Sequence, residues 1–171
     1  MSQHFVQAGV PDITLDEILA IKHPDAPAWS PDGQWLDWRW DDGGLVHLWA
    51  ARSEGGEPVQ VSRGETSVGT FDWSPEGELA FSQGGDIWLA RPGQEPRPLT
   101  RGGGKDALPS WSPSGRQLAF TRDGALWIYD FESACLSALS LPGAVVAGYA
   151  DSACIRWSPG GSRLAAGILD G

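Results

Sequence analysis

Residues able to perform acid–base or nucleophilic chemistry are scattered along this chain. The three histidines, His4, His23 and His47, lie far apart in the sequence and in segments of different character. A Ser-His-Asp triad needs a histidine that a carboxylate positions, and no grouping here suggests one. A nucleophile elbow has the pattern Gly-x-Ser-x-Gly, whereas the nearest segment, Gly64–Gly69, has the wrong spacing. We therefore assign no catalytic residue.

Candidate ligand sites are equally weak. Asp41-Asp42-Gly43 could offer oxygens to calcium, but such a run between strands is typical of a hairpin turn. Lys105 lies beside Gly102-Gly103-Gly104, in an order that is wrong for a phosphate-binding loop. Two opposed carboxylates could support glycoside hydrolysis, yet nothing singles out a pair among the many acids. We assign no metal site and no cofactor.

The strongest pattern in the sequence is a repeated turn motif. It indicates the strands that would hold any functional site in place. Trp-Ser-Pro-x-Gly occurs four times, and the tryptophans lie 44, 38 and 46 residues apart. A period of about 40–50 residues built from short strands is typical of β-propeller blades. The copies are Trp29-Ser30-Pro31-Asp32-Gly33, Trp73-Ser74-Pro75-Glu76-Gly77, Trp111-Ser112-Pro113-Ser114-Gly115 and Trp157-Ser158-Pro159-Gly160-Gly161.

The third repeat shows how one blade is built. The motif turn separates two short strands, and a tight Asp123-Gly124 turn suits the next hairpin. Four short strands joined by tight turns make a propeller blade. The expected strands are 108–111, 117–121, 125–130 and 135–140. The tryptophan of each motif is expected to pack in the blade core.

These repeats predict an all-β fold, a partial β-propeller of four-stranded antiparallel blades. Three blades are whole (about 26–64, 65–104 and 105–144), and a fourth begins at 145–171. Residues 1–25 form an N-terminal extension with a short helix, for which Thr14-Leu15-Asp16-Glu17 fits a capping box. The fourth blade lacks its outer strands, which leaves an open edge that could support self-association.

Composition narrows the classes of partner and compartment. The formal net charge of −10 disfavours nucleic acid and anionic membranes as partners. No run is long and apolar enough for a transmembrane helix, and the first residues lack the features of a secretory signal. We therefore expect a cytoplasmic protein. Cys135 and Cys154 are expected to be buried reduced thiols, although their spacing also permits a bridge.

The Trp-Ser-Pro-Asp-Gly turn, with Leu-Ala-Phe after two later copies, resembles the PD40 type of propeller repeat. That repeat type occurs in the translocation protein TolB and in the N-terminal propeller of the prolyl oligopeptidase family of serine peptidases, which includes dipeptidyl peptidase IV and the acylaminoacyl peptidases. The segment Ile13–Ile21, followed by Ala26–Gly33, resembles the start of those peptidases.

The resemblance implies a two-domain serine peptidase whose propeller gates or positions peptide substrates for an α/β-hydrolase domain not present in this chain. Dipeptidyl peptidases carry a Glu-Glu motif on the propeller, whereas the corresponding stretch Ala144–Tyr149 has no acid. This difference disfavours dipeptidyl aminopeptidase specificity and leaves an acylaminoacyl- or oligopeptidase-like activity. The alternative is a non-catalytic TolB-like propeller that serves as a protein–protein interaction module.

Overall fold

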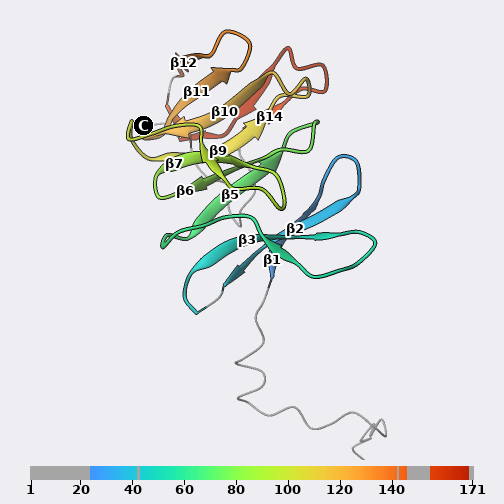
Figure 1. Cartoon of the computed structure of the whole chain (residues 1–171). Helices are drawn as coiled ribbons and strands as arrows, with labels where there is room; N and C mark the ends of the chain where they lie inside the picture. Colours follow the sequence, from blue (N-terminus) through green and yellow to red (C-terminus); the bar gives the residue numbers. More distant parts are fainter. Residues whose placement is uncertain (1–23, 42, 142, 146–154, 170–171) are drawn as a thin grey trace, which may run out of the picture.

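The computed structural model describes residues 24–41, 43–141, 143–145 and 155–169, and within them the chain is all-β (Figure 1). The sixteen strands of these residues pair with one another in the antiparallel sense. The predicted partial propeller of four-stranded blades is thereby confirmed. The expected N-terminal helix and its capping box lie outside the described residues.

Three sheets of four strands follow one another along the chain, and we call them blades 1, 2 and 3. Each has its strands in sequence order from the first to the fourth. Blade 1 contains β1 (Asp25–Trp29), β2 (Trp35–Asp41), β3 (Val46–Arg52) and β4 (Val59–Gln60). Blade 2 contains β5 (Val68–Trp73), β6 (Leu79–Gln83), β7 (Asp86–Ala90) and β8 (Arg97–Pro98). Blade 3 contains β9 (Asp106–Trp111), β10 (Gln117–Arg122), β11 (Ala125–Asp130) and β12 (Cys135–Leu139).

The fourth blade is represented by two short pairs of strands. β13 (Ala144–Val145) pairs with β16 (Ile168–Leu169), and β14 (Ile155–Trp157) pairs with β15 (Leu164–Ala166). In blades 1 to 3 the first strand shifts register partway along its pairing with the second strand. β13 and β14 together therefore take the place of a first strand, and β15 and β16 that of a second strand.

The repeated motif forms the turn between the first and second strands, for a reason visible in its hydrogen bonds. In blade 3 the carbonyl of Ser112 accepts the N–H of Gly115 at 2.9 Å, while Pro113 occupies the position that favours proline. The Ser112 hydroxyl accepts the N–H of Gln117 at 3.0 Å, and Gly115 has a φ of +69°. Ser30, Ser74 and Ser158 accept equivalent N–H groups at 2.9–3.0 Å. The serine of the motif therefore fastens the turn to the start of the second strand.

The next hairpin uses the turn chemistry expected from the sequence. Between β10 and β11 both Asp123 and Gly124 have positive φ, +50° and +79°. Two consecutive left-handed residues make the primed turn whose twist matches antiparallel strands. Aspartate and glycine are among the residue types that tolerate a positive φ best. The Asp123-Gly124 pair therefore sets the register of this hairpin.

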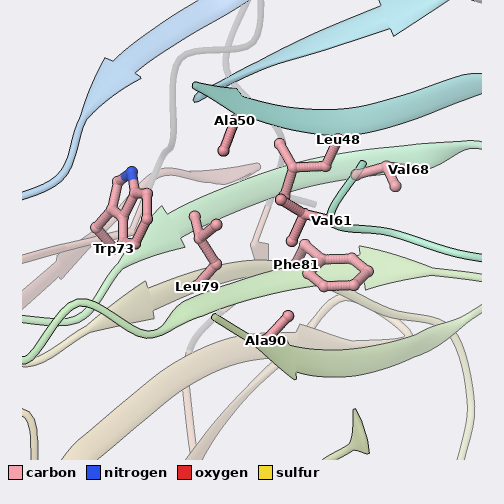
Figure 2. Packing of buried hydrophobic residues seen from close by; sticks show 8 residues of the cluster. All are labelled: Leu48, Ala50, Val61, Val68, Trp73, Leu79, Phe81 and Ala90. Atoms are coloured by element: carbon pink, nitrogen blue, oxygen red, sulfur yellow. The ribbon is translucent and has the colours of Figure 1, made fainter. Parts of the chain in front are cut away.

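The hydrophobic core lies between successive blades, which stack face to face (Figure 1). Figure 2 shows Leu48 and Ala50 of β3 pointing toward Leu79 and Phe81 of β6, and all four are fully buried. A second cluster joins blades 2 and 3, and a third joins blade 3 to β13, β14 and β15. Each blade is therefore held mainly by its neighbours rather than by a core of its own.

One expectation about the cysteines is wrong. Cys135 is exposed and free at the start of β12, the outermost strand of blade 3. All five residues of β12 are exposed, and no described strand pairs with its outer edge. Cys154 lies outside the described residues.

Candidate functional site

The residue that precedes each motif tryptophan lines a cavity at the innermost strands. These residues are Ala28, Asp72, Ser110 and Arg156, and the cavity measures about 260 Å³. A second hollow of about 320 Å³ shares Asp72, Ser110 and Arg156 with the first. The innermost strands lie together, since β9 contacts both β5 and β14. We call the two joined hollows the axial cavity. Its remaining described lining residues are Ala26, Pro27, Pro31, Arg39, Thr70, Phe71, Trp73, Pro75, Pro109, Trp111, Ser112, Pro113 and Trp157.

Asp72 supplies negative charge to the axial cavity and also joins two blades. Its Oδ2 accepts the backbone N–H of Trp111 at 2.7 Å, from β5 to β9. Burial raises the pKa of Asp72 to about 6, and the bond from Trp111 and the charge of Arg156 oppose that rise. The carboxyl group is therefore mostly ionised at neutral pH, even though it lies in a partly desolvated place.

Two arginines line the axial cavity, and they differ in whether a carboxylate pairs with them. Arg39 on β2 donates from Nε and Nη2 to Asp25, each at 2.8 Å, and from Nη1 to the carbonyl of Gly69 at 3.0 Å. Arg156 on β14 is exposed, and no described residue forms a hydrogen bond or ion pair with its guanidinium. Arg39 is thus fixed in a structural pair, whereas Arg156 is available to a ligand.

A second carboxylate, Asp37, is fully buried between blades 1 and 2. Its Oδ1 accepts the indole N–H of Trp73 at 2.6 Å, and its Oδ2 has no hydrogen-bond partner among the described residues. Burial raises the pKa of Asp37 to about 7. Alanine stands at the corresponding position in the next two blades, at Ala80 and Ala119, so this acid is peculiar to blade 1.

Of the candidate histidines and aspartates predicted from the sequence, His47 and Asp41 are described, and both have structural roles. The Nδ1 of His47 lies 3.1 Å from the Ser62 hydroxyl in a buried pair, and His4 and His23 lie outside the described residues. Asp41 accepts the N–H of Gly44 at 2.7 Å, as in a hairpin turn, and Asp42 is not described.

The glycine-rich loop donates its N–H groups to carboxylates rather than leaving them for phosphate. The N–H of Gly102 is donated to Asp86 and that of Lys105 to Asp123, each at 2.9 Å. In the described ranges no three His, Cys, Asp or Glu side chains gather as a metal site would require. Within those same ranges no helix has the length and apolar character needed to cross a membrane.

Sequence reasoning missed Asp72 and Arg156. A signal for them was present, because the motif itself is constant whereas the residue before its tryptophan changes from alanine to aspartate, serine and arginine. A position that varies in chemistry inside a constant repeat is free from the demands of packing. In this fold that position faces the axial cavity.

The fold defines the chain as part of a β-propeller, and comparisons with known proteins agree. It shares its fold with the putative TolB from Agrobacterium tumefaciens (TM-score 0.65, 18% identity, 86% of this chain and 59% of that chain). It also shares it with puromycin hydrolase (TM-score 0.68, 19% identity, 86% of this chain and 25% of that chain).

At the sequence level no family model matches. The uncharacterized protein YidR of Escherichia coli strain K12 is 32% identical over 100 residues, which cover 52% of this chain and 23% of YidR. The chain thus spans less than two thirds of each of these three proteins.

Proposed function

We propose that this chain is the propeller part of a serine peptidase of the prolyl oligopeptidase family, in which it positions peptide substrates for an α/β-hydrolase domain. The observation that carries the proposal is the axial cavity, lined by the innermost strands of four successive blades and bearing Asp72 and Arg156. The fold shared with puromycin hydrolase supports it. So does the resemblance of Ile13–Ile21 and Ala26–Gly33 to the start of such peptidases.

The chemistry of the axial cavity suits a peptide in extended form. An extended backbone presents N–H and C=O groups at short intervals and needs acceptors and donors along its path. Asp72 offers an acceptor, and Arg156 offers several donors. The proline and alanine side chains that also line the cavity, Pro27, Ala28 and Pro109, leave room for a backbone to approach.

The test uses the whole polypeptide that the native gene encodes. A fluorophosphonate probe reacts with the activated serine of such peptidases, and an acyl-aminoacyl or peptidyl arylamide reports turnover. We expect covalent labelling of one serine and hydrolysis that is lost when that serine is replaced by alanine. A polypeptide that folds, takes up no probe and releases no arylamine would contradict the peptidase proposal.

The alternative is a non-catalytic propeller that binds another protein, as the resemblance to TolB implies. The fold that the chain shares with the putative TolB, at a TM-score of 0.65, supports it. Absence of labelling, together with recovery of a stoichiometric protein complex from the native host, is the outcome expected of this alternative.

A further inference from the structure

We propose that Arg156 binds the carboxylate of a short peptide in the axial cavity, while Asp72 accepts N–H groups of the same peptide. The identity of the ligand as a peptide rests on the proposed function. The binding of a carboxylate by Arg156 rests on the structure of the cavity.

Two other arginines of the blades show how a guanidinium binds a carboxylate in this fold. Arg39 donates two hydrogen bonds of 2.8 Å to Asp25, and Arg122 donates hydrogen bonds of 2.7 and 2.8 Å to Asp106. In both pairs the planar guanidinium meets the two oxygens of one carboxylate, which is its preferred geometry. Arg156 has no such carboxylate among the described residues.

The nearest acid does not fill that role. Asp72 influences Arg156 electrostatically, but the two side chains form no ion pair, and Oδ2 of Asp72 is committed to the N–H of Trp111. Arg156 therefore remains an exposed guanidinium at the wall of a cavity. A carboxylate entering the cavity would complete the same bidentate pair that the other two arginines already make.

The charge of the cavity selects among anions. A phosphate group carries more negative charge than a carboxylate, and Asp72 on the same wall repels it. The formal net charge of −10 adds to that repulsion for a polyanion. A ligand with one carboxylate and several N–H donors satisfies both Arg156 and Asp72, and a peptide end has this composition.

The size of the cavity sets an upper limit on the ligand. Ligand pockets for drug-sized molecules usually measure about 300–1,000 Å³, and the two hollows here measure about 260 and 320 Å³. Such a space accepts a few small residues rather than a folded partner. Ser110, between Asp72 and Arg156, adds a hydroxyl along the path.

Calorimetric titration of the native gene product tests the proposal. Its reactive serine is first blocked with the fluorophosphonate, and the probes are Ala-Ala-Ala with a free carboxylate and the same peptide as its C-terminal amide. Only the free carboxylate can form a charge-assisted bidentate pair with Arg156. We therefore expect the free acid to bind at least about tenfold more tightly than the amide.

Matched variants assign that preference to one side chain. The variant Arg156→Gln should bind the acid and the amide equally tightly. The control variant Arg163→Gln removes another exposed arginine, directly before β15, and should keep the preference for the acid. Equal binding of acid and amide by the wild type, no detectable heat, or a preserved preference in Arg156→Gln would each overturn the proposal. Because the acid and amide are compared on the wild type, the test does not depend on how a variant folds.

Failure of this inference can be told apart from failure of the proposed function. Serine labelling with no role for Arg156 leaves the peptidase proposal standing and removes this one. Absence of labelling with an Arg156-dependent preference for the free acid removes the peptidase but leaves a carboxylate-binding propeller.

Discussion

Blades 1 and 3 share a motif tryptophan and an Asp–Arg ion pair at equivalent positions, but only blade 3 has a described blade on both sides. The motif tryptophan Trp29 is 58% exposed, whereas Trp111 is 7% exposed and Trp73 is 8% exposed. The expectation that each motif tryptophan packs in a core is confirmed for Trp73 and Trp111 and is wrong for Trp29. This tryptophan is therefore an interface residue. It is buried at Trp73 and Trp111, where a described blade precedes it, and exposed at Trp29, where none does.

An ion pair shows the same contrast. Asp25 pairs with Arg39 across β1 and β2, and Asp106 pairs with Arg122 across β9 and β10, at equivalent register positions. The side chain of Asp25 is 54% exposed, whereas that of Asp106 is completely buried. One sequence pattern therefore gives a solvated pair at the end of the array and a desolvated pair inside it.

We expect the largest difference between the two blades when the motif tryptophan of each is replaced by alanine. Trp111→Ala removes a buried indole from the cluster between blades 2 and 3, and we expect a loss of about 3–5 kcal/mol in the free energy of unfolding. Trp29→Ala removes an exposed indole and should cost less than about 1 kcal/mol. Urea unfolding followed by circular dichroism measures both. Equal losses would show that the tryptophan acts within its own blade.

Asp37 gives the next test, since blade 3 carries Ala119 at the corresponding position. The pKa of Asp37 rises from 3.8 to about 7 on folding, so the folded chain binds the proton more tightly than the unfolded chain does. The associated stability is complete below about pH 4 and is lost as the pH rises through 7. At about 1.4 kcal/mol per pKa unit, the ionised carboxylate costs up to about 4 kcal/mol above pH 7.

Asp37→Asn removes this cost because the amide does not ionise, while its oxygen still accepts the indole N–H of Trp73. We expect the variant to be more stable than the wild type at pH 8 and to lose most of the decline in stability between pH 4 and 7. Asp72 keeps its own raised pKa of about 6 and contributes the decline that remains. A variant with the wild-type pH profile would contradict a buried, titrating Asp37.

The ion pairs give a smaller difference. Arg122→Gln leaves the carboxylate of Asp106 buried without its cation, and we expect a loss of about 3 kcal/mol. Arg39→Gln leaves Asp25 in contact with water, so the loss should be about 1 kcal/mol or less. Thermal unfolding at low and high salt checks both, since only the solvated pair should be sensitive to screening.

Local chemistry explains what could be predicted from the sequence. Trp111-Ser112-Pro113-Ser114-Gly115 and Asp123-Gly124 determine their turns through hydrogen bonds and backbone preferences within a few residues. The strands between them follow directly. The exposure of Trp29 could not be predicted in this way, because it depends on whether another blade lies against it.

The variable residue before each motif tryptophan was a sequence signal for Asp72 and Arg156, but it did not show that these residues share one cavity. Asp72 and Arg156 are 84 residues apart in the sequence and meet at one cavity because β5, β9 and β14 converge there. Periodicity predicts that innermost strands exist, but it does not predict which side chain of each strand faces the axis. The register with the second strand decides that, and it shifts within every first strand of blades 1 to 3.

A substitution on the exposed face of blade 1 should have the smallest effect on stability. Its effect should appear instead in the association of the chain, which is measured as mass. Trp29 exposes an indole at the position that a preceding blade covers elsewhere, so this face is suited to pairing with a blade of a second copy. We expect sedimentation equilibrium of the chain to show concentration-dependent association, and Trp29→Ser to weaken it with little change in the free energy of unfolding. Leu136→Ser, on the exposed strand β12, is the matched control and should leave association unchanged. Association that is lost in Leu136→Ser and kept in Trp29→Ser would assign it to the outer strand of blade 3 instead.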